Sequence, residues 1–324
     1  MGRSVRLSVA AGTALLALAG AASAGENKAP KGMPTTTGLI EGPAARYVNL
    51  RADIAHIEAM EMKSATQMRE AHNRLGSFDP AEMTSAWVAY AALVAADTPA
   101  FSRAIERETV KQKDRKIFLS ELQANPAMVR DLDGADEAIA AIRAVAARDA
   151  TRINRLGDRF IADAYRMQNA GWAKKKIPQD GTARLNAATA WGQSRSWTLT
   201  ELPTKQPTKA GNVRPHLDRD EMWSPAWYAE NAPASEADKT GALMTKALLL
   251  AVRYATGDLT EGQVKAYATS KPSNRCYVNA KLNLDQCIAA TRTPYEEAFC
   301  LGEHALNDIS HCVGWVANAG RKKD

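Results

Sequence analysis

Residues 276–312 read CYVNAKLNLDQCIAATRTPYEEAFCLGEHALNDISHC, and they contain all four cysteines of the 324-residue chain. The cysteines stand at positions 276, 287, 300 and 312, nearly symmetric about a point between Arg292 and Pro294. This spacing is typical of a helical hairpin that is closed by two nested disulfides. The stretch therefore predicts a local architecture and an oxidising environment, although it names no activity.

Two helices are predicted on either side of the centre of this stretch. Residues 279–290 have a helix-friendly composition. Thr293, Pro294 and Glu296 are typical of a helix start, with threonine as the N-cap, proline at the first helical position and glutamate completing a capping box. A turn near Arg292 would place the two helices antiparallel to each other.

Helix geometry restricts how the cysteines can pair. Four cysteines allow three pairings, but 11 residues along one helix rise about 16 Å. The Cα atoms of a disulfide lie only about 4.4–6.8 Å apart, so two cysteines of one helix cannot bond. The antiparallel hairpin then favours Cys287–Cys300 as the inner disulfide and Cys276–Cys312 as the outer one.

The stretch resembles the twin-cysteine helical hairpins of the coiled-coil-helix-coiled-coil-helix class. The resemblance is confined to these residues and implies architecture alone, because that family has shorter spacers than the ten and eleven residues found here. A zinc site is the alternative, since His304 follows Cys300 by one helical turn and His311 adjoins Cys312. The lack of a C-x-x-C pair favours structural disulfides over zinc or redox chemistry.

Residues 1–24 are typical of a cleaved secretory signal. Arg3 and Arg6 precede a short apolar run, and the small residues ASA at 22–24 suit a cleavage site. The run is shorter than the about 20 apolar residues of a membrane span, and basic residues interrupt the best later candidate, residues 241–254. We therefore expect an exported soluble protein, periplasmic or secreted, without a membrane span.

The rest of the chain predicts an all-α fold. Residues 25–43 read as a flexible leader, and residues 44–170 carry apolar positions at helical spacing that favour an antiparallel helical bundle. Residues 235–318 contain a strongly apolar helix and then the disulfide-closed helical hairpin, and residues 319–324 form a basic tail. No strand-like alternation competes with this interpretation.

A loop-rich connector, residues 171–234, separates the two helical regions, and five of the seven tryptophans fall within it. Long irregular segments are often functional, and indoles stack on sugar rings. The candidate binding residues, for an envelope glycan or a protein partner, are Trp191, Trp197, Trp223 and Trp227. The alternative is that these tryptophans pack the connector onto the bundle.

Two other classes of function also follow from residue types. Connector carboxylates could supply the acid and base of a cell-wall glycan hydrolase; they are Glu201, Asp218, Asp220 and Glu221. Imidazoles and thioethers suit copper, and a set of them spaced by multiples of four lies on the first predicted helix, at His56, Met60, Met68 and His72. Because steps of four drift by about 40° each, a core or surface role is favoured there, and no metal or cofactor is predicted.

Asp149 occupies the apolar stripe of the longest predicted helix, residues 136–168. A carboxylate at such a position must be paired or hydrated, and Arg148, Arg152 and Arg155 are close in sequence. The position predicts either an edge of the bundle or a polar site inside it.

The formal net charge of +6 is a mild excess, and part of it lies in residues 319–324. The sequence shows no basic face of the kind that binds nucleic acid, and it lacks the H-E-x-x-H and P-loop signatures. The prediction is a non-catalytic envelope or secreted binding or structural module, with the glycan hydrolase and the metal-binding protein as alternatives.

Overall fold

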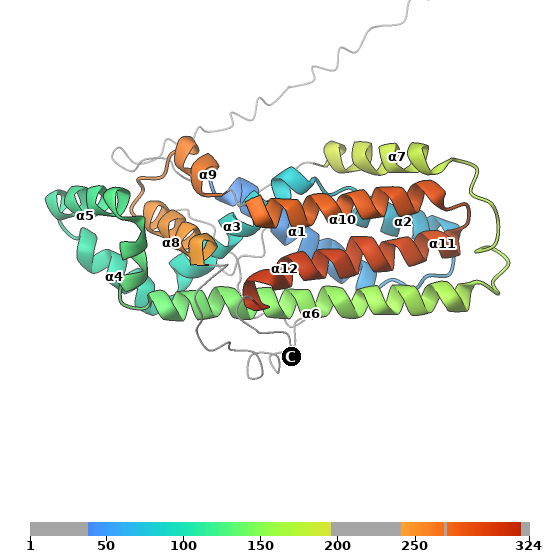
Figure 1. Ribbon diagram of the computed structural model, residues 1–324, viewed down its shortest axis with the longest axis horizontal. Coiled ribbons are helices and arrows are strands. Elements are labelled where there is room, and N and C mark those ends of the chain that lie inside the picture. Colours follow the sequence, from blue (N-terminus) through green and yellow to red (C-terminus); the bar gives the residue numbers. More distant parts are fainter. Residues whose placement is uncertain (1–37, 196–240, 269–270, 319–324) are drawn as a thin grey trace, which may run out of the picture. The chain divides into compact units, whose positions relative to one another are not determined.

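The computed structural model describes residues 38–195, 241–268 and 271–318, all within one compact unit that spans Pro34–Asp324. Every regular element among these residues is helical, so the predicted all-α class is confirmed (Figure 1). The helices are α1 (Glu41–Glu58), α2 (Ala65–Gly76), α3 (Pro80–Asp97), α4 (Pro99–Thr109), α5 (Gln112–Ala124), α6 (Ala135–Met167), α7 (Gly181–Ser194), α8 (Gly241–Ala255), α9 (Glu261–Tyr267), α10 (Lys271–Ala290), α11 (Pro294–Cys300) and α12 (Asp308–Asn318), with a 3₁₀ turn η1 (Pro126–Asp131) and a π-helical turn η4 (Leu301–Asn307).

Helix α3 is the central helix of the unit. Its sequence is apolar on all sides, with Ala, Val, Leu, Trp and Tyr, and nearly all of its side chains between Met83 and Ala96 are buried. A helix of this composition must be covered all round, and α1, α8, α10 and α6 pack against it. None of the described helices is both long and apolar enough to cross a membrane.

The N-terminal helical region is broken where the sequence predicted continuity. The sequence placed His56 and His72 on one helix, but α1 ends at Glu58 and α2 starts at Ala65. The side chain of Ser64 accepts a hydrogen bond from the backbone N–H of Gln67 and thereby caps α2. That prediction was wrong because a local cap outweighed the periodic pattern.

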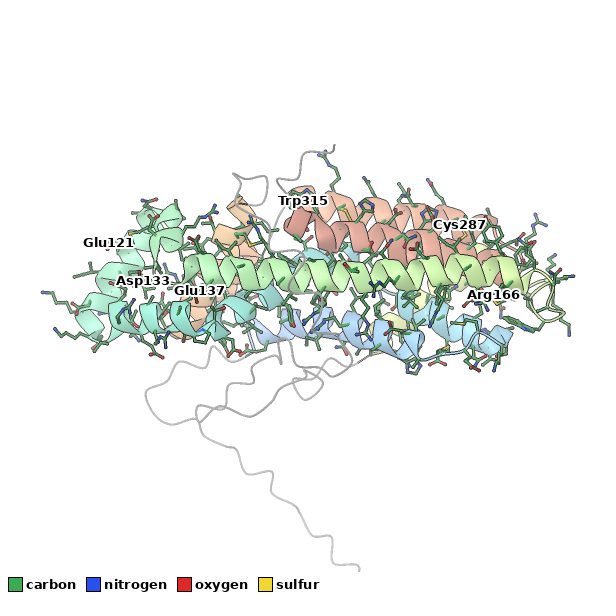
Figure 2. The ribbon with its side chains drawn as sticks, turned by 90° about the horizontal axis from the view of Figure 1, so that it is seen from below. Glu121, Asp133, Glu137, Arg166, Cys287 and Trp315 are labelled. Carbon is green, nitrogen blue, oxygen red and sulfur yellow. A yellow bond between two sulfur atoms is a disulfide. The ribbon has the colours of Figure 1, made fainter. Side chains whose placement is uncertain are left out.

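The disulfide-closed hairpin is confirmed as α10 followed by α11, η4 and α12. Cys276–Cys312 and Cys287–Cys300 are both bonded, each with its Cα atoms 5.6 Å apart. The zinc alternative is therefore wrong, because all four thiols are in disulfides. Together the hairpin and α6 form one layer, and Cys287 lies toward the end of α6 that carries Arg166 (Figure 2).

The predicted start of the second arm is also confirmed. Thr293 and Glu296 form the capping box, and Glu296 Oε2 accepts hydrogen bonds from the backbone N–H groups of Arg292 (2.7 Å) and Thr293 (2.9 Å). Burial alone would raise the pKa of Glu296, but these donated hydrogen bonds outweigh it and hold the pKa below its ordinary value.

Two glycines allow the hairpin to approach α6 closely. A Cβ atom on Gly302 would lie 2.8 Å from the carbonyl oxygen of Gly157, and one on Gly157 would lie 2.9 Å from that of Gly302. Gly302 stands in the π-helical turn η4, opposite Gly157 on α6. The mid-helix glycine thus permits backbone contact between two helices.

Candidate functional site

Much of the predicted tryptophan site lies outside the described residues. This applies to Trp197, Trp223 and Trp227 and to the carboxylates Glu201, Asp218, Asp220 and Glu221, so their roles stay predictions. Part of the segment, residues 171–195, is described. It includes helix α7, which the sequence did not predict, and α7 begins where the Asp180 side chain accepts a hydrogen bond from the backbone N–H of Ala183 (2.8 Å).

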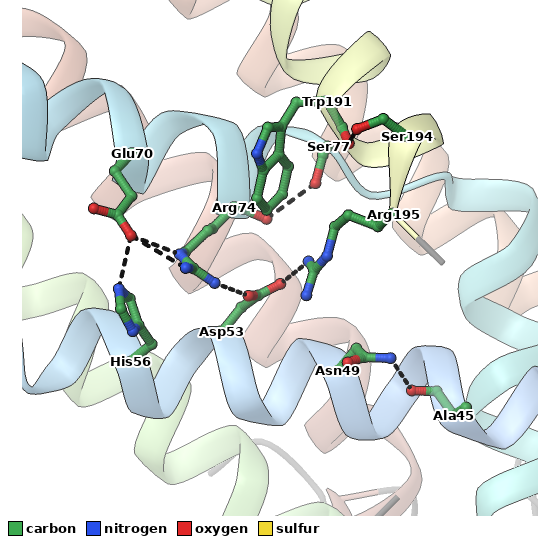
Figure 3. Close-up of polar contacts among 10 residues, drawn as sticks. All are labelled: Ala45, Asn49, Asp53, His56, Glu70, Arg74, Ser77, Trp191, Ser194 and Arg195. Carbon is green, nitrogen blue, oxygen red and sulfur yellow. Dashed lines mark hydrogen bonds and ion pairs between the residues drawn. The ribbon is translucent and has the colours of Figure 1, made fainter. Parts of the chain in front are cut away.

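Trp191 on α7 makes its contacts within the molecule. The guanidinium carbon of Arg195 lies 4.8 Å from the indole centroid and that of Arg74 lies 5.7 Å away, both within cation–π range. Figure 3 shows the half-buried indole between these two arginines. Trp191 therefore fastens α7 to α2, and its role in glycan binding stays a prediction.

Asp53 on α1 joins the same cluster (Figure 3). It is buried, and its two oxygens accept from Arg74 Nη1 (2.8 Å) and Arg195 Nη1 (2.5 Å). Arg74 also donates to Glu70, which receives a further hydrogen bond from His56 at 2.8 Å. Because the acidic and basic side chains of this cluster pair with one another, we interpret it as a set of contacts that holds α1, α2 and α7 together.

Asp149 forms a polar site inside the bundle. This confirms the second of the two alternatives that the sequence left open for it, the first being an edge position. The carboxylate is fully buried; Tyr47 donates to Oδ2 at 2.8 Å, and the Nε atoms of Arg51 and Arg148 lie 3.4 Å and 3.9 Å away. Arg51 Nη1 also donates to the hydroxyl of Tyr90 (2.7 Å). Burial, and then the Asp149 charge, raise the pKa of Tyr47 well above its ordinary value.

A cavity of about 500 Å³ is lined by residues of α2, α7, α11 and the loop that precedes α7. Figure 1 shows α2, α7 and α11 near the C-terminal end of α6. We call it the α2–α7 pocket. Its size and largely apolar wall are typical of small-molecule sites. Its described lining residues are Ala65, Arg69, His72, Asn73, Trp172, Lys175, Lys176, Ile177, Pro178, Gln179, Ala183, Arg184, Ala187, Pro294 and Glu297.

The polar wall of the α2–α7 pocket is a buried triad. His72 Nδ1 is hydrogen-bonded to Glu297 Oε1, and Arg184 Nε lies 3.7 Å from the same oxygen. Arg184 is 8 % exposed and its Nη2 donates to the backbone oxygens of Ile288 and Thr291, both at 3.0 Å, and to Thr291 Oγ1 at 2.6 Å. These contacts fix the guanidinium in one orientation.

Three nitrogens of the triad lack a hydrogen-bond partner within the described part of the chain: Arg184 Nε, Arg184 Nη1 and His72 Nε2. An unsatisfied buried donor costs about 1–3 kcal/mol, so such groups in a pocket wall suit an incoming acceptor. Arg184 is the stronger group because it is permanently charged; its Nε already faces Glu297 Oε1 at 3.7 Å, which leaves Nη1 for this purpose.

The pocket is assembled from segments that are distant in sequence. Ile177 N donates to Arg292 O at 2.8 Å, which ties the loop to the hairpin turn. A Cβ on Gly181 would lie 2.4 Å from the Cα of Ala289, so glycine lets α7 begin directly against α10. His72 and Glu297 are 225 positions apart. Sequence reasoning missed this pocket, because no local pattern links residues so far apart.

The copper alternative, which the sequence did not favour, is not assembled by the described residues. His56 pairs with Glu70 and His72 pairs with Glu297, while Met68 is fully buried in the core. Among the described residues, no group of three or more His, Cys, Asp or Glu side chains is placed to hold a metal. Thioethers do gather elsewhere: a second cavity, of about 580 Å³, is lined by Met60, Met62 and Met167 together with Trp172.

No protein-family model matches the chain, and no curated protein or solved structure is significantly similar to it.

Proposed function

We propose that this protein is an exported, non-catalytic binding module of the periplasm or the secreted fluid, and that its ligand occupies the α2–α7 pocket. The observation that carries the proposal is the buried Arg184, which lines an apolar cavity of about 500 Å³ while two of its nitrogens have no acceptor among the described residues. The two disulfides suit an oxidising compartment.

Binding is favoured over catalysis by the chemistry of the pocket wall. The described lining residues include no serine, threonine, cysteine or tyrosine that could act as a nucleophile. A general base needs direct reach to the proton that it removes. His72 is the single histidine among the described lining residues, and none of them offers a hydroxyl or thiol for it to deprotonate. The triad therefore supports a role in holding a ligand.

Filling the pocket tests this function. Ligand-observed NMR with a library of aromatic and aliphatic fragments should find binders to the mature chain. Ala187 lines the pocket and its neighbour Asn186 is exposed outside the lining. We expect Ala187→Trp to abolish the binding of those fragments and Asn186→Trp to leave it intact. The proposal fails if no fragment loses binding in the Ala187→Trp variant.

The proposed export of the protein is tested by a separate experiment. The mature protein, isolated from its native compartment, should begin near Gly25 and carry no free thiols. Intact-mass spectrometry measures both properties in one experiment. A chain that retains residues 1–24, or that has reduced cysteines, would contradict the proposed location.

A soft metal ion is a second candidate ligand for the chain. Met60 and Met62 are two residues apart in the segment between α1 and α2, and with Met167 at the end of α6 they line one cavity. Thioethers favour monovalent copper or silver. Titration of the chain with Ag⁺ should give one binding site that Met60→Leu weakens and that Met68→Leu, in the buried core, leaves unchanged; no stoichiometric binding excludes this candidate.

The glycan hydrolase is tested by zymography on cell walls. Glu201→Gln and Glu221→Gln should each abolish clearing if the connector carboxylates are the acid and base. Clearing that is unaltered in both variants removes these two residues as catalysts.

A further inference from the structure

We infer that the ligand of the α2–α7 pocket is a small organic carboxylate with an apolar or aromatic body. This inference rests on the proposed binding function and specifies its ligand class. It depends on three properties of the described lining residues: their charge, the free donors of Arg184 and the apolar surface beside them.

The charge of the pocket wall is unbalanced. Among the described lining residues, Arg69, Lys175, Lys176 and Arg184 are cationic, and Glu297 is the single carboxylate. Glu297 is already engaged by His72 and Arg184. Arg69, Lys175 and Lys176 are exposed and make no ion pair with any residue that the structure describes. The pocket therefore favours an anion over a neutral or cationic ligand.

Arg184 supplies the site where the anion can be fixed. The backbone oxygens of Ile288 and Thr291 both accept hydrogen bonds from its Nη2. Nε and Nη1 carry the remaining donors and have no hydrogen-bond partner within the described residues. Nε–H points to the Nη2 side of the guanidinium and faces Glu297 Oε1 at 3.7 Å, so Nη1 is the donor left for one oxygen of a carboxylate, through a single charge-assisted hydrogen bond. Because Arg184 is already ordered, its side chain loses little freedom on binding.

The remaining wall argues for a ligand with an apolar body. Trp172, Ile177, Pro178 and Pro294 line the pocket together with several alanines. Trp172 is partly buried against the core, so its indole is a firm surface on which a flat apolar group can pack. An inorganic anion would leave this surface uncovered, whereas an aromatic carboxylate uses both parts of the pocket.

Isothermal titration calorimetry with matched probes tests the inference on the full mature chain. The probes are naphthalene-2-carboxylate, its neutral analogue naphthalene-2-carboxamide, and inorganic phosphate as a charge without an apolar body. We expect the carboxylate to bind at least about tenfold more tightly than either other probe, since charge-assisted hydrogen bonds to arginine are about twice as strong as neutral ones. Its affinity should fall as salt is added.

The lysines give a matched pair of variants. Lys175→Gln and Lys176→Gln should each weaken carboxylate binding by about two- to fivefold, the range for exposed charge pairs. Lys174, also exposed in the same loop, is outside the pocket lining, so Lys174→Gln should leave the affinity unchanged. Arg184→Gln should remove the preference for the carboxylate over the carboxamide. Thermal melting checks that this variant folds, and the lysine variants decide the question if it does not.

The outcomes separate the ligand class from the function. Equal affinity for the carboxylate and the carboxamide overturns the inference and leaves the binding function standing. An equal loss from Lys174→Gln and Lys175→Gln overturns it too, because the effect would then come from diffuse charge. If neither naphthalene probe binds at millimolar concentration, and no fragment is displaced by Ala187→Trp, the binding function fails together with the inference.

Discussion

Replacing Asp149 by asparagine should destabilise the protein more than any other change that keeps the side-chain volume. The carboxylate is fully buried and faces the guanidinium groups of Arg51 and Arg148 at 3.4 Å and 3.9 Å. At an effective dielectric constant of about 20, Coulomb's law gives roughly 5 and 4 kcal/mol of gross attraction at these distances. Asparagine has the same shape, so the substitution removes the charge without opening a cavity.

The net effect is smaller than the gross attraction, because the three charges were desolvated when the chain folded. Removing one partner of a buried ion pair costs about 3–5 kcal/mol, and we expect Asp149→Asn to lower the free energy of unfolding by this amount. The melting temperature should fall by about 6–20 °C, at about 2–4 °C per kcal/mol for a domain of this order of size.

Urea denaturation of the oxidised chain at pH 7, followed by circular dichroism, measures the loss. Tyr47→Phe removes only the hydrogen bond to Asp149 and should cost about 1 kcal/mol. Asp158→Asn changes an exposed carboxylate on the same helix and should lie within about 0.5 kcal/mol of the wild type. A loss from Asp149→Asn no larger than that from Tyr47→Phe would refute the electrostatic reasoning.

Three further perturbations test the hairpin and its contact with α6. Glu296→Gln should lower stability at neutral pH but match the wild type in acid. The pKa of Glu296 is depressed in the folded state, so its stabilisation is present above the unfolded pKa of about 4.3 and is lost as the pH falls through the folded value; a constant difference between pH 7 and pH 3 in urea titrations contradicts this. Gly302→Ala should cost about 1–3 kcal/mol through overpacking against α6. Gly262→Ala, where the nearest atom to a Cβ is 4.0 Å away, should gain up to about 1 kcal/mol, and similar melting temperatures for the two variants would exclude the close contact. Replacing Cys276 and Cys312 together by serine should cost about 3–4 kcal/mol, somewhat more than replacing the inner pair, because the outer bond spans 36 positions and the inner one 13; a larger loss from the inner pair in urea denaturation would contradict this ranking.

Local signals in the sequence were sufficient to predict the disulfide-closed hairpin. The N-cap at Thr293 and the proline after it specify a helix start without reference to the rest of the chain. Helix geometry then restricts the disulfide pairing. Asp149 could also be identified, because one carboxylate in an apolar stripe requires a partner wherever the chain folds. These features depend on short-range spacing, which a single sequence contains.

The candidate site could not be predicted in the same way. Its triad joins residues of α2, α7 and α11, and the sequence favoured a core or surface role for His72 on a helix that the structure divides. Arg184 stands in a segment that the sequence marked as irregular, since the cap at Asp180 was not recognised. Glu297 follows the capping glutamate, and nothing in its own neighbourhood indicates that it is buried. The burial and the contacts of these three residues depend on packing between segments that are far apart in the sequence.

The order of the helices along the chain has a consequence for biosynthesis. Helix α6 emerges from the ribosome long before α11, η4 and α12, the segments that cover its apolar stripe; Asn154 and its hydrogen-bond partner Asn307 are 153 positions apart. A nascent chain must carry this partly uncovered helix while residues 168–293 are synthesised. Holding chaperones thus have a defined target in α6, and a stop codon between α6 and α11 would yield an aggregation-prone fragment.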